Sequence, residues 1–143
     1  MTRITNSVLW LVMIWLTTGG TLLAQAPLKV KESFAKKFPK AQNTNWEEDD
    51  DVYVAHFVND TTKTEATFEK SGKWTESKAE VSLTKLPDVV KKVVLKKFEG
   101  SKLDEAVFIE RPKSKHYEVS IITKDEKYLF VIVNEEGKIL DFN

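Results

Sequence analysis

Two histidines, His56 and His116, are the side chains of this sequence best suited to acid–base or metal chemistry near neutral pH. Neither is accompanied by a second His or a Cys at the spacing that metal sites use. By the alternation of strand residues, His56 faces the uncovered side of a sheet, whereas His116 lies at the edge of a turn. We therefore expect two ordinary surface histidines and no metal site.

Five consecutive acidic residues, at 47–51, form a second candidate site because calcium is bound by carboxylate oxygens. The run lacks the alternating Asp loop with a Gly and a closing Glu that calcium-binding loops use, and consecutive residues of a hairpin point to different sides. We interpret the run as a solvated turn that also keeps a sheet edge from pairing with other chains.

Other catalytic patterns are missing from the sequence. It contains no Cys, which excludes disulfides, thiolate metal sites and a Cys nucleophile. It also contains no Gly-x-Ser-x-Gly motif, no phosphate-binding glycine loop and no paired-carboxylate arrangement. We expect a protein without enzymatic activity and without a cofactor.

Residues 1–26 are predicted to be a secretory signal peptide. Arg3 lies in a short polar leader, residues 8–16 are an unbroken apolar run, and Ala24 and Ala26 are small enough for cleavage at Ala26 or a residue or two earlier. The apolar run is too short to span a bilayer, which takes about 20 residues. We expect residues 27–143 to be periplasmic or secreted, without stable membrane insertion.

The charge balance argues against nucleic acid as a partner. The chain has 22 Lys and Arg residues and 22 Asp and Glu residues, and removal of the leader takes away only Arg3 from these groups. A protein that binds phosphates needs a surplus of basic residues to replace counterions, and this chain has none.

The elements that position these side chains are predicted from an internal repeat. Residues 27–38 and 87–98 share Pro, Val, three Lys and Phe without a gap, which indicates two copies of one unit, 27–85 and 86–143. Each copy begins with an amphipathic helix. The apolar faces of the two helices carry Val30, Phe34 and Phe38 in the first copy and Val90, Val94 and Phe98 in the second.

Four alternating segments follow each helix and predict antiparallel strands. They lie near 44–49, 52–59, 63–70 and 73–82 in the first copy, and near 103–111, 115–124, 127–134 and 138–142 in the second. Each unit is therefore α-β-β-β-β, and the fold class is α+β.

The repeat also predicts which side chains face the helices. Tyr53, Ala55 and Phe57 in the first copy correspond to Tyr117, Val119 and Ile121 in the second, and all six are expected to face the helices. Residues between them fall on the opposite face, where the second copy is more apolar. We predict an exposed binding patch there, with His56 and Val58 at its periphery. Its anchors are Ile122, Tyr128, Phe130 and Ile132.

The sequence resembles the PepSY-like family of small exported proteins, whose fold is similar to that of the β-lactamase inhibitory protein. The resemblance rests on the leader, the repeat without Cys, and four short motifs. These motifs are Phe38-Pro39-x-Ala41, Leu86-Pro87, Gly72-Lys73 and Gly137-Lys138. It implies one curved antiparallel sheet of about eight strands with two helices on one face. The inhibitor-like members bind a protein through the curved face, but this chain lacks the disulfides of the classical inhibitor, so inhibition of a β-lactamase is not carried over.

Three functions remain open at this point. The first is a non-enzymatic binding module that engages a protein or peptide through the open sheet face, inhibition being one form of such binding. The second is a periplasmic carrier or sensor of a small ligand that uses the concavity of the sheet. The third is a structural role through dimerisation at a sheet edge.

Overall fold

The structure is a computed structural model, and it describes residues 25–143. The predicted signal peptide therefore lies, apart from its last two residues, outside the described residues. Two helices alternate with two runs of four strands. In chain order the elements are α1 (Leu28–Lys37), β1 (Gln42–Asp49), β2 (Val52–Asn59), β3 (Thr62–Glu69), β4 (Trp74–Glu80), α2 (Asp88–Lys97), β5 (Lys102–Arg111), β6 (Ser114–Ile122), β7 (Tyr128–Asn134) and β8 (Ile139–Phe142).

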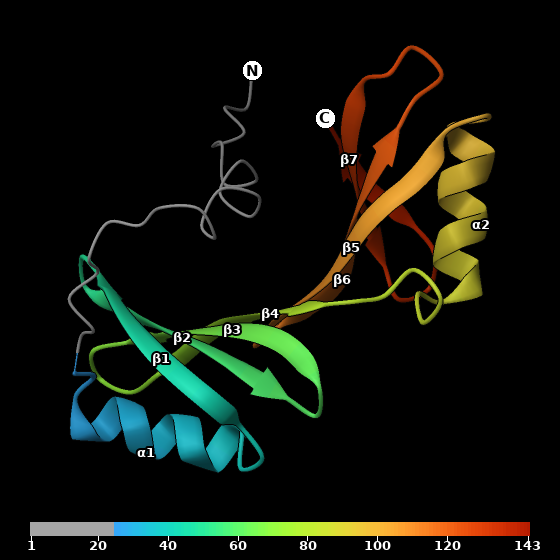
Figure 1. Ribbon diagram of the computed structural model, residues 1–143. Coiled ribbons are helices and arrows are strands. Elements are labelled where there is room, and N and C mark those ends of the chain that lie inside the picture. The colour runs from blue at the N-terminus through green and yellow to red at the C-terminus, as the bar shows by residue number, and fades with distance from the viewer. Residues whose placement is uncertain (1–24) are drawn as a thin grey trace.

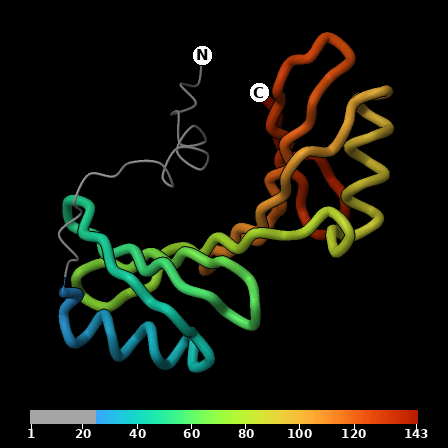
Figure 2. The backbone as a smooth tube through the Cα atoms, viewed as in Figure 1, coloured from blue at the N-terminus to red at the C-terminus, as the bar shows by residue number. Residues whose placement is uncertain are grey.

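The eight strands form one open antiparallel sheet in which every strand pairs with its neighbours in the chain. The predicted α+β class is confirmed, and the predicted strand boundaries agree with the observed ones to within two residues. The sheet bends strongly, and β4, β5 and β6 run through the bend (Figure 1). The chain crosses from one half to the other after β4, along residues 81–87 (Figure 2).

Both helices cover the same face of the sheet, the convex one (Figure 1). The strand register shows this independently, because residues that are paired directly across neighbouring strands point to the same face. One row of paired residues joins the two halves on this face. It consists of Thr64, Ala79, Phe108, Tyr117 and Val133.

The buried side chains form two separate clusters, one under each helix. Under α1 the cluster is largely aromatic, and Phe34 packs edge-on against Trp46 and Phe57 with ring centroids 5.2 and 4.9 Å apart. Under α2 the cluster is aliphatic, and it contains Leu86, Val90, Val94, Ala106, Val119, Ile121, Val131 and Val133. The predicted helix faces are confirmed, with Phe38 and Phe98 only partly buried at the helix ends.

Two glycine turns fit tightly against the helices and explain the motifs noted in the sequence. Gly72 has φ +90°, and a Cβ there would lie 2.8 Å from the carbonyl oxygen of Lys29 in α1. Gly137 has φ +83°, and a Cβ there would lie 2.5 Å from a methyl group of Val89 in α2. Both positions require glycine for its positive φ, and both turns bring the sheet into contact with a helix.

Candidate functional site: the open face of the sheet

The concave face of the sheet, here called the open face, has no helix over it among residues 25–143 (Figure 1). Strand register places nine carboxylates on this face, in contrast to four Lys and Arg side chains. The carboxylates are Glu47, Asp49, Glu65, Glu69, Glu76, Glu80, Glu105, Glu118 and Asp141, and the basic residues are Lys63, Lys78, Lys102 and Arg111.

His56 lies on the open face as predicted, between carboxylates from the two neighbouring strands. Its Nδ1 is 3.4 Å from Oε1 of Glu65, and its Nε2 is 3.3 Å from Oε2 of Glu47. The hydrogen bond to Glu65 raises the pKa of His56, and the charges of Glu65 and Glu47 add to this effect while burial opposes it. The same hydrogen bond lowers the pKa of Glu65. His56 is thus a half-buried histidine whose protonated form is favoured by two carboxylates, and it is not an unengaged surface histidine.

A hollow of about 240 Å³ lies on this half of the open face. Its wall includes His56, Val58, Lys78 and Val107, so it reaches from β2 across to β5. The structure therefore brings the two predicted peripheral residues, His56 and Val58, into one concavity.

The prediction for His116 was wrong. The β5–β6 turn is shorter than expected, because Arg111 pairs with Ser114, so His116 lies inside β6 opposite Ile109 and Asn134. It points to the open face and is only 8% exposed. Burial lowers the pKa of His116, Arg111 adds to this effect, and Glu76 opposes it. It is therefore a buried neutral imidazole.

Glu118 is the residue that the sequence analysis did not single out. It follows His116 by two positions on the same face of β6, and it is 9% exposed although no helix of residues 25–143 covers it. Burial raises the pKa of Glu118, while Lys78 and Arg111 act in the opposite direction. The His-x-Glu spacing on a strand was the available sequence signal, but the packing of both residues among the neighbouring strands β5 and β7 cannot be seen in a linear pattern.

An ion-pair group joins the two halves next to Glu118. Oε2 of Glu76 accepts from Nε of Arg111, and Nη2 of Arg111 lies 2.6 Å from the same oxygen. The other carboxylate oxygen of Glu76 is 3.3 Å from Nζ of Lys78. Because Glu76 and Lys78 belong to β4 and Arg111 belongs to β5, these contacts lie at the junction between the halves.

The predicted apolar patch lies on the open face of β6 and β7. Tyr128 is 61% exposed, whereas Ile122, Phe130 and Ile132 are partly buried by their neighbours in the sheet. Tyr128 pairs with Ile122, and Ile132 pairs with Glu118, so the patch is continuous and borders the buried carboxylate. His56 and Val58 are on β2, four strands from β6 and five from β7, so the predicted binding residues form two separate groups.

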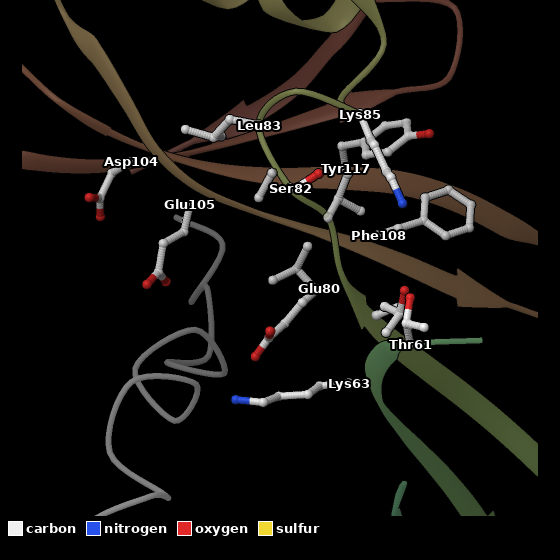
Figure 3. A pocket seen from close by; sticks show the side chains of 15 residues that line it. Thr61, Lys63, Glu80, Ser82, Leu83, Lys85, Asp104, Glu105, Phe108 and Tyr117 are labelled. Carbon is white, nitrogen blue, oxygen red and sulfur yellow. The ribbon is translucent and has the colours of Figure 1, made fainter. Parts of the chain in front are cut away.

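A larger hollow of about 870 Å³ lies where the chain leaves β4 for α2 (Figure 3). Its wall combines the start of β3, residues 79–85 and the start of β5. Figure 3 shows the side chains of Lys63 and Glu80 on one side of the β4 ribbon and those of Phe108 and Tyr117 on the other. The wall thus contains residues of both faces.

Two further observations concern metal binding and membrane-spanning helices. In the part of the chain that the structure describes, no group of three or more His, Asp or Glu side chains is arranged to hold a metal ion. None of the helices in residues 25–143 is long and apolar enough to cross a bilayer.

The chain is similar to a known family and to several solved structures. The family model described as "Putative beta-lactamase-inhibitor-like, PepSY-like" matches residues 51–141. No curated protein matches the sequence.

Solved structures with a similar fold come from Bacteroides species. A BLIP-like protein from Bacteroides fragilis is 22% identical with a TM-score of 0.77, the match covering 84% of this chain and 86% of that one. A DUF2874 family protein from Bacteroides uniformis is 19% identical with a TM-score of 0.75, covering 83% and 89%. A protein from Bacteroides eggerthii described as "putative periplasmic" is 18% identical with a TM-score of 0.74, covering 84% and 89%. At these identities the likeness shows the fold alone.

Proposed function

The chain belongs to the PepSY-like family of beta-lactamase-inhibitor-like proteins, and from this premise we propose that it is a non-enzymatic binding module that engages a protein partner through the open face. One observation carries the proposal. The open face holds an apolar patch around Tyr128, which is 61% exposed, and no helix among residues 25–143 covers it. Apolar side chains gathered on an uncovered surface are typical of interaction sites.

The composition of the patch supports a protein partner. A large exposed Tyr beside Phe130 and Ile132 supplies aromatic and aliphatic contact area, and aromatic residues are enriched at the centres of protein interfaces. The concave shape of the sheet would let one partner contact strands of both halves. Blocking the active site of an enzyme is one form that such binding can take.

The common element order of the two halves, one helix followed by four strands, supports the inference that they descend from one duplicated unit. Under this inference the open faces of the two halves began alike, and the apolar patch is a feature that the second half acquired or kept.

A periplasmic or secreted location fits the predicted leader. Ala26 is 4% exposed and belongs to the cluster under α1, so cleavage after Ala26 would remove a buried side chain from the core. We infer that cleavage follows Ala24, which leaves Gln25 as the first residue. Mass spectrometry of the exported protein measures this position, and a mature chain that begins at Pro27 would contradict it.

The test of the proposed function is capture of a partner from native envelope extract by immobilised wild-type protein and by Phe130→Asp. We expect Phe130→Asp to lose the captured protein while its melting temperature stays close to the wild-type value. Leu28→Asp is the matched control, because Leu28 is 72% exposed and lies on α1, away from the open face. Equal capture by both variants would refute the proposal, and a large loss of stability in Phe130→Asp would show that Phe130 belongs to the core.

A second candidate function rests on the larger hollow. Its volume of about 870 Å³ is within the range of small-molecule sites, which keeps a ligand carrier or sensor as the alternative. Native mass spectrometry of protein purified from its own envelope distinguishes the two, because a carrier retains a bound small molecule and a protein-binding module does not.

A further inference from the structure

Glu118 combines deep burial with the absence of any bonding partner. Only 9% of the residue is exposed, yet its carboxylate makes no hydrogen bond and no ion pair with any residue in 25–143. Its oxygens keep some contact with solvent, because the indole Nε1 of Trp74 is the one fully enclosed side-chain polar atom without a partner in residues 25–143. A largely desolvated carboxylate without protein donors is still costly.

The neighbours of Glu118 do not supply the missing donors, and His116, two positions earlier on the same face, makes no hydrogen bond to it. Val107 and Ile132 lie directly across from it on β5 and β7, and both are apolar. Ser120, the next residue on the same face, already donates its hydroxyl to Asp104 and accepts the backbone N–H of Glu105.

The nearest cations are also engaged elsewhere. Arg111 and Lys78 both contact Glu76, at 2.6 and 3.3 Å, and they influence Glu118 only through their charge. The carboxylate of Glu118 is therefore directed to a concave surface without a bonded counter-ion.

The distribution of charge over the molecule points to a basic partner. Nine carboxylates and four basic residues lie on the open face, whereas the two helices on the other side carry eight lysines and two carboxylates. The balance of the whole sequence is zero, so this asymmetry arises from the fold. A surface of one sign favours a partner of the opposite sign and speeds its approach.

On the basis of the proposed function, we propose that Glu118 binds the cationic group of a Lys or Arg side chain, which a protein partner places between Val107 and Ile132. A charge-assisted hydrogen bond from such a side chain would satisfy the carboxylate. Ile132 is directly opposite Glu118, and Phe130 pairs with Ser120, so a partner that covers the apolar patch also excludes water from this contact. Arginine contacts ringed by neighbours that exclude water are frequent among interface hot spots.

A protein side chain is favoured over a free amine because Glu118 lies on a broad sheet face beside the apolar patch. A small cation alone would leave that patch in water. The Glu118 contact would then be too weak to persist, since an isolated exposed ion pair contributes little.

The test uses two synthetic peptides that differ by one charge. One is acetyl-Gly-Ser-Leu-Arg-Leu-Ser-Gly-amide, and the other carries citrulline, the neutral isostere of arginine, in place of Arg. Binding is followed by the amide shifts of Val107, Glu118 and Ile132 in NMR spectra. We expect the Arg peptide to bind wild-type protein at least tenfold more tightly than the citrulline peptide, and Glu118→Gln to bind both equally weakly.

Two controls give these outcomes a clear meaning. Glu105→Gln removes an exposed carboxylate from the same face and should keep the tenfold preference. n-Butylguanidinium should bind wild-type protein at least tenfold more weakly than the Arg peptide, and equal binding would overturn the assignment to a protein side chain. Thermal unfolding of Glu118→Gln should show a melting temperature no lower than that of the wild type.

The outcomes also separate this inference from the proposed function. A wild-type protein without a preference for Arg, or a preference that survives in Glu118→Gln, overturns the role of Glu118 alone. If Phe130→Asp captures partners as the wild type does, the open face is not the binding surface and the proposed function fails as well.

Discussion

The two halves of the sheet place charged side chains on the same face but treat them differently. In the first half, His56 lies between Glu47 and Glu65, and its two ring nitrogens contact both carboxylates. In the second half, Glu118 is more deeply buried and has no bonded partner in residues 25–143. The first half therefore pairs its histidine with two carboxylates, although the indole N–H of Trp74 in β4 has no acceptor in residues 25–143, whereas the second half leaves the Glu118 carboxylate without a bonded partner.

The cores of the two halves differ as well. Aromatic rings fill the space under α1, and small branched side chains fill the space under α2. The first half keeps its aromatic residues inside, while the second half has Phe130 and Tyr128 on the open face. Under the proposed function, the first half is mainly a scaffold and the second half supplies the contact surface.

The largest effect is expected in the aromatic core. Phe68 is fully buried, so Phe68→Ala should lower the free energy of unfolding by about 3–5 kcal/mol, while Ile121→Val in the aliphatic core should lower it by about 0.5–1.5 kcal/mol. Because one sheet joins the halves, fluorescence of Trp46 and Trp74 and far-UV circular dichroism should report the same urea transition. Separate transitions would show that the halves unfold independently.

The two glycine turns give a smaller difference between the halves. Gly72→Ala should destabilise by about 1–2 kcal/mol from its positive φ alone, and more because its Cβ would meet the backbone oxygen of Lys29. Gly137→Ala should cost less than Gly72→Ala, because its contact is a methyl group of Val89, which is 44% exposed and can move. Chemical denaturation of both variants measures the difference, and a larger loss for Gly137→Ala would contradict the structure.

Glu118→Gln should stabilise the free protein near pH 7, by roughly 1 kcal/mol, because it removes a largely desolvated charge without protein donors. Burial raises the pKa of Glu118, so folding favours the protonated form of this side chain. The carboxylate therefore does not destabilise the wild type below about pH 4.5, and its destabilising effect appears as pH rises through the folded pKa. The stability difference between variant and wild type should therefore grow with pH. A loss of stability at pH 7 would mean that Glu118 is held by partners within the fold.

His56→Gln should show the opposite behaviour, with the smallest effect. The raised pKa of His56 means that its contacts with Glu65 and Glu47 contribute fully below about pH 6.5 and are lost as pH rises through the folded pKa. At acid pH the contribution falls again as Glu65, whose pKa is lowered, becomes protonated. We expect about 0.5–1 kcal/mol between these limits, because the pair is partly exposed. A pH-independent difference would exclude the ion pair as its cause.

Much of the fold could be predicted from local patterns. The helix stripes at Val30 and Val90 and the alternation around Ala55 and Val119 encode which side chains are buried, because each element has a fixed period. The turn residues Gly72 and Gly137 were visible for the same reason, since a positive φ strongly favours glycine.

The candidate site was only partly visible. The apolar residues of β6 and β7 were found because they interrupt the expected alternation, but the burial of His116 and Glu118 was missed. A turn shorter by one residue places His116 inside β6, and packing against neighbouring strands buries both side chains; neither follows from the spacing of residues along one strand.

The sequence by itself determined the secondary structure, the two helix-facing surfaces and the overall neutrality of the chain, because these depend on residue types and on short periodic spacings. Only the tertiary structure decided that acidic residues gather on one face and lysines on the other, and that His56 meets two carboxylates while Glu118 meets none. These properties depend on which strands become neighbours and on how the sheet bends, so distances between charges are set by contacts that no local pattern records.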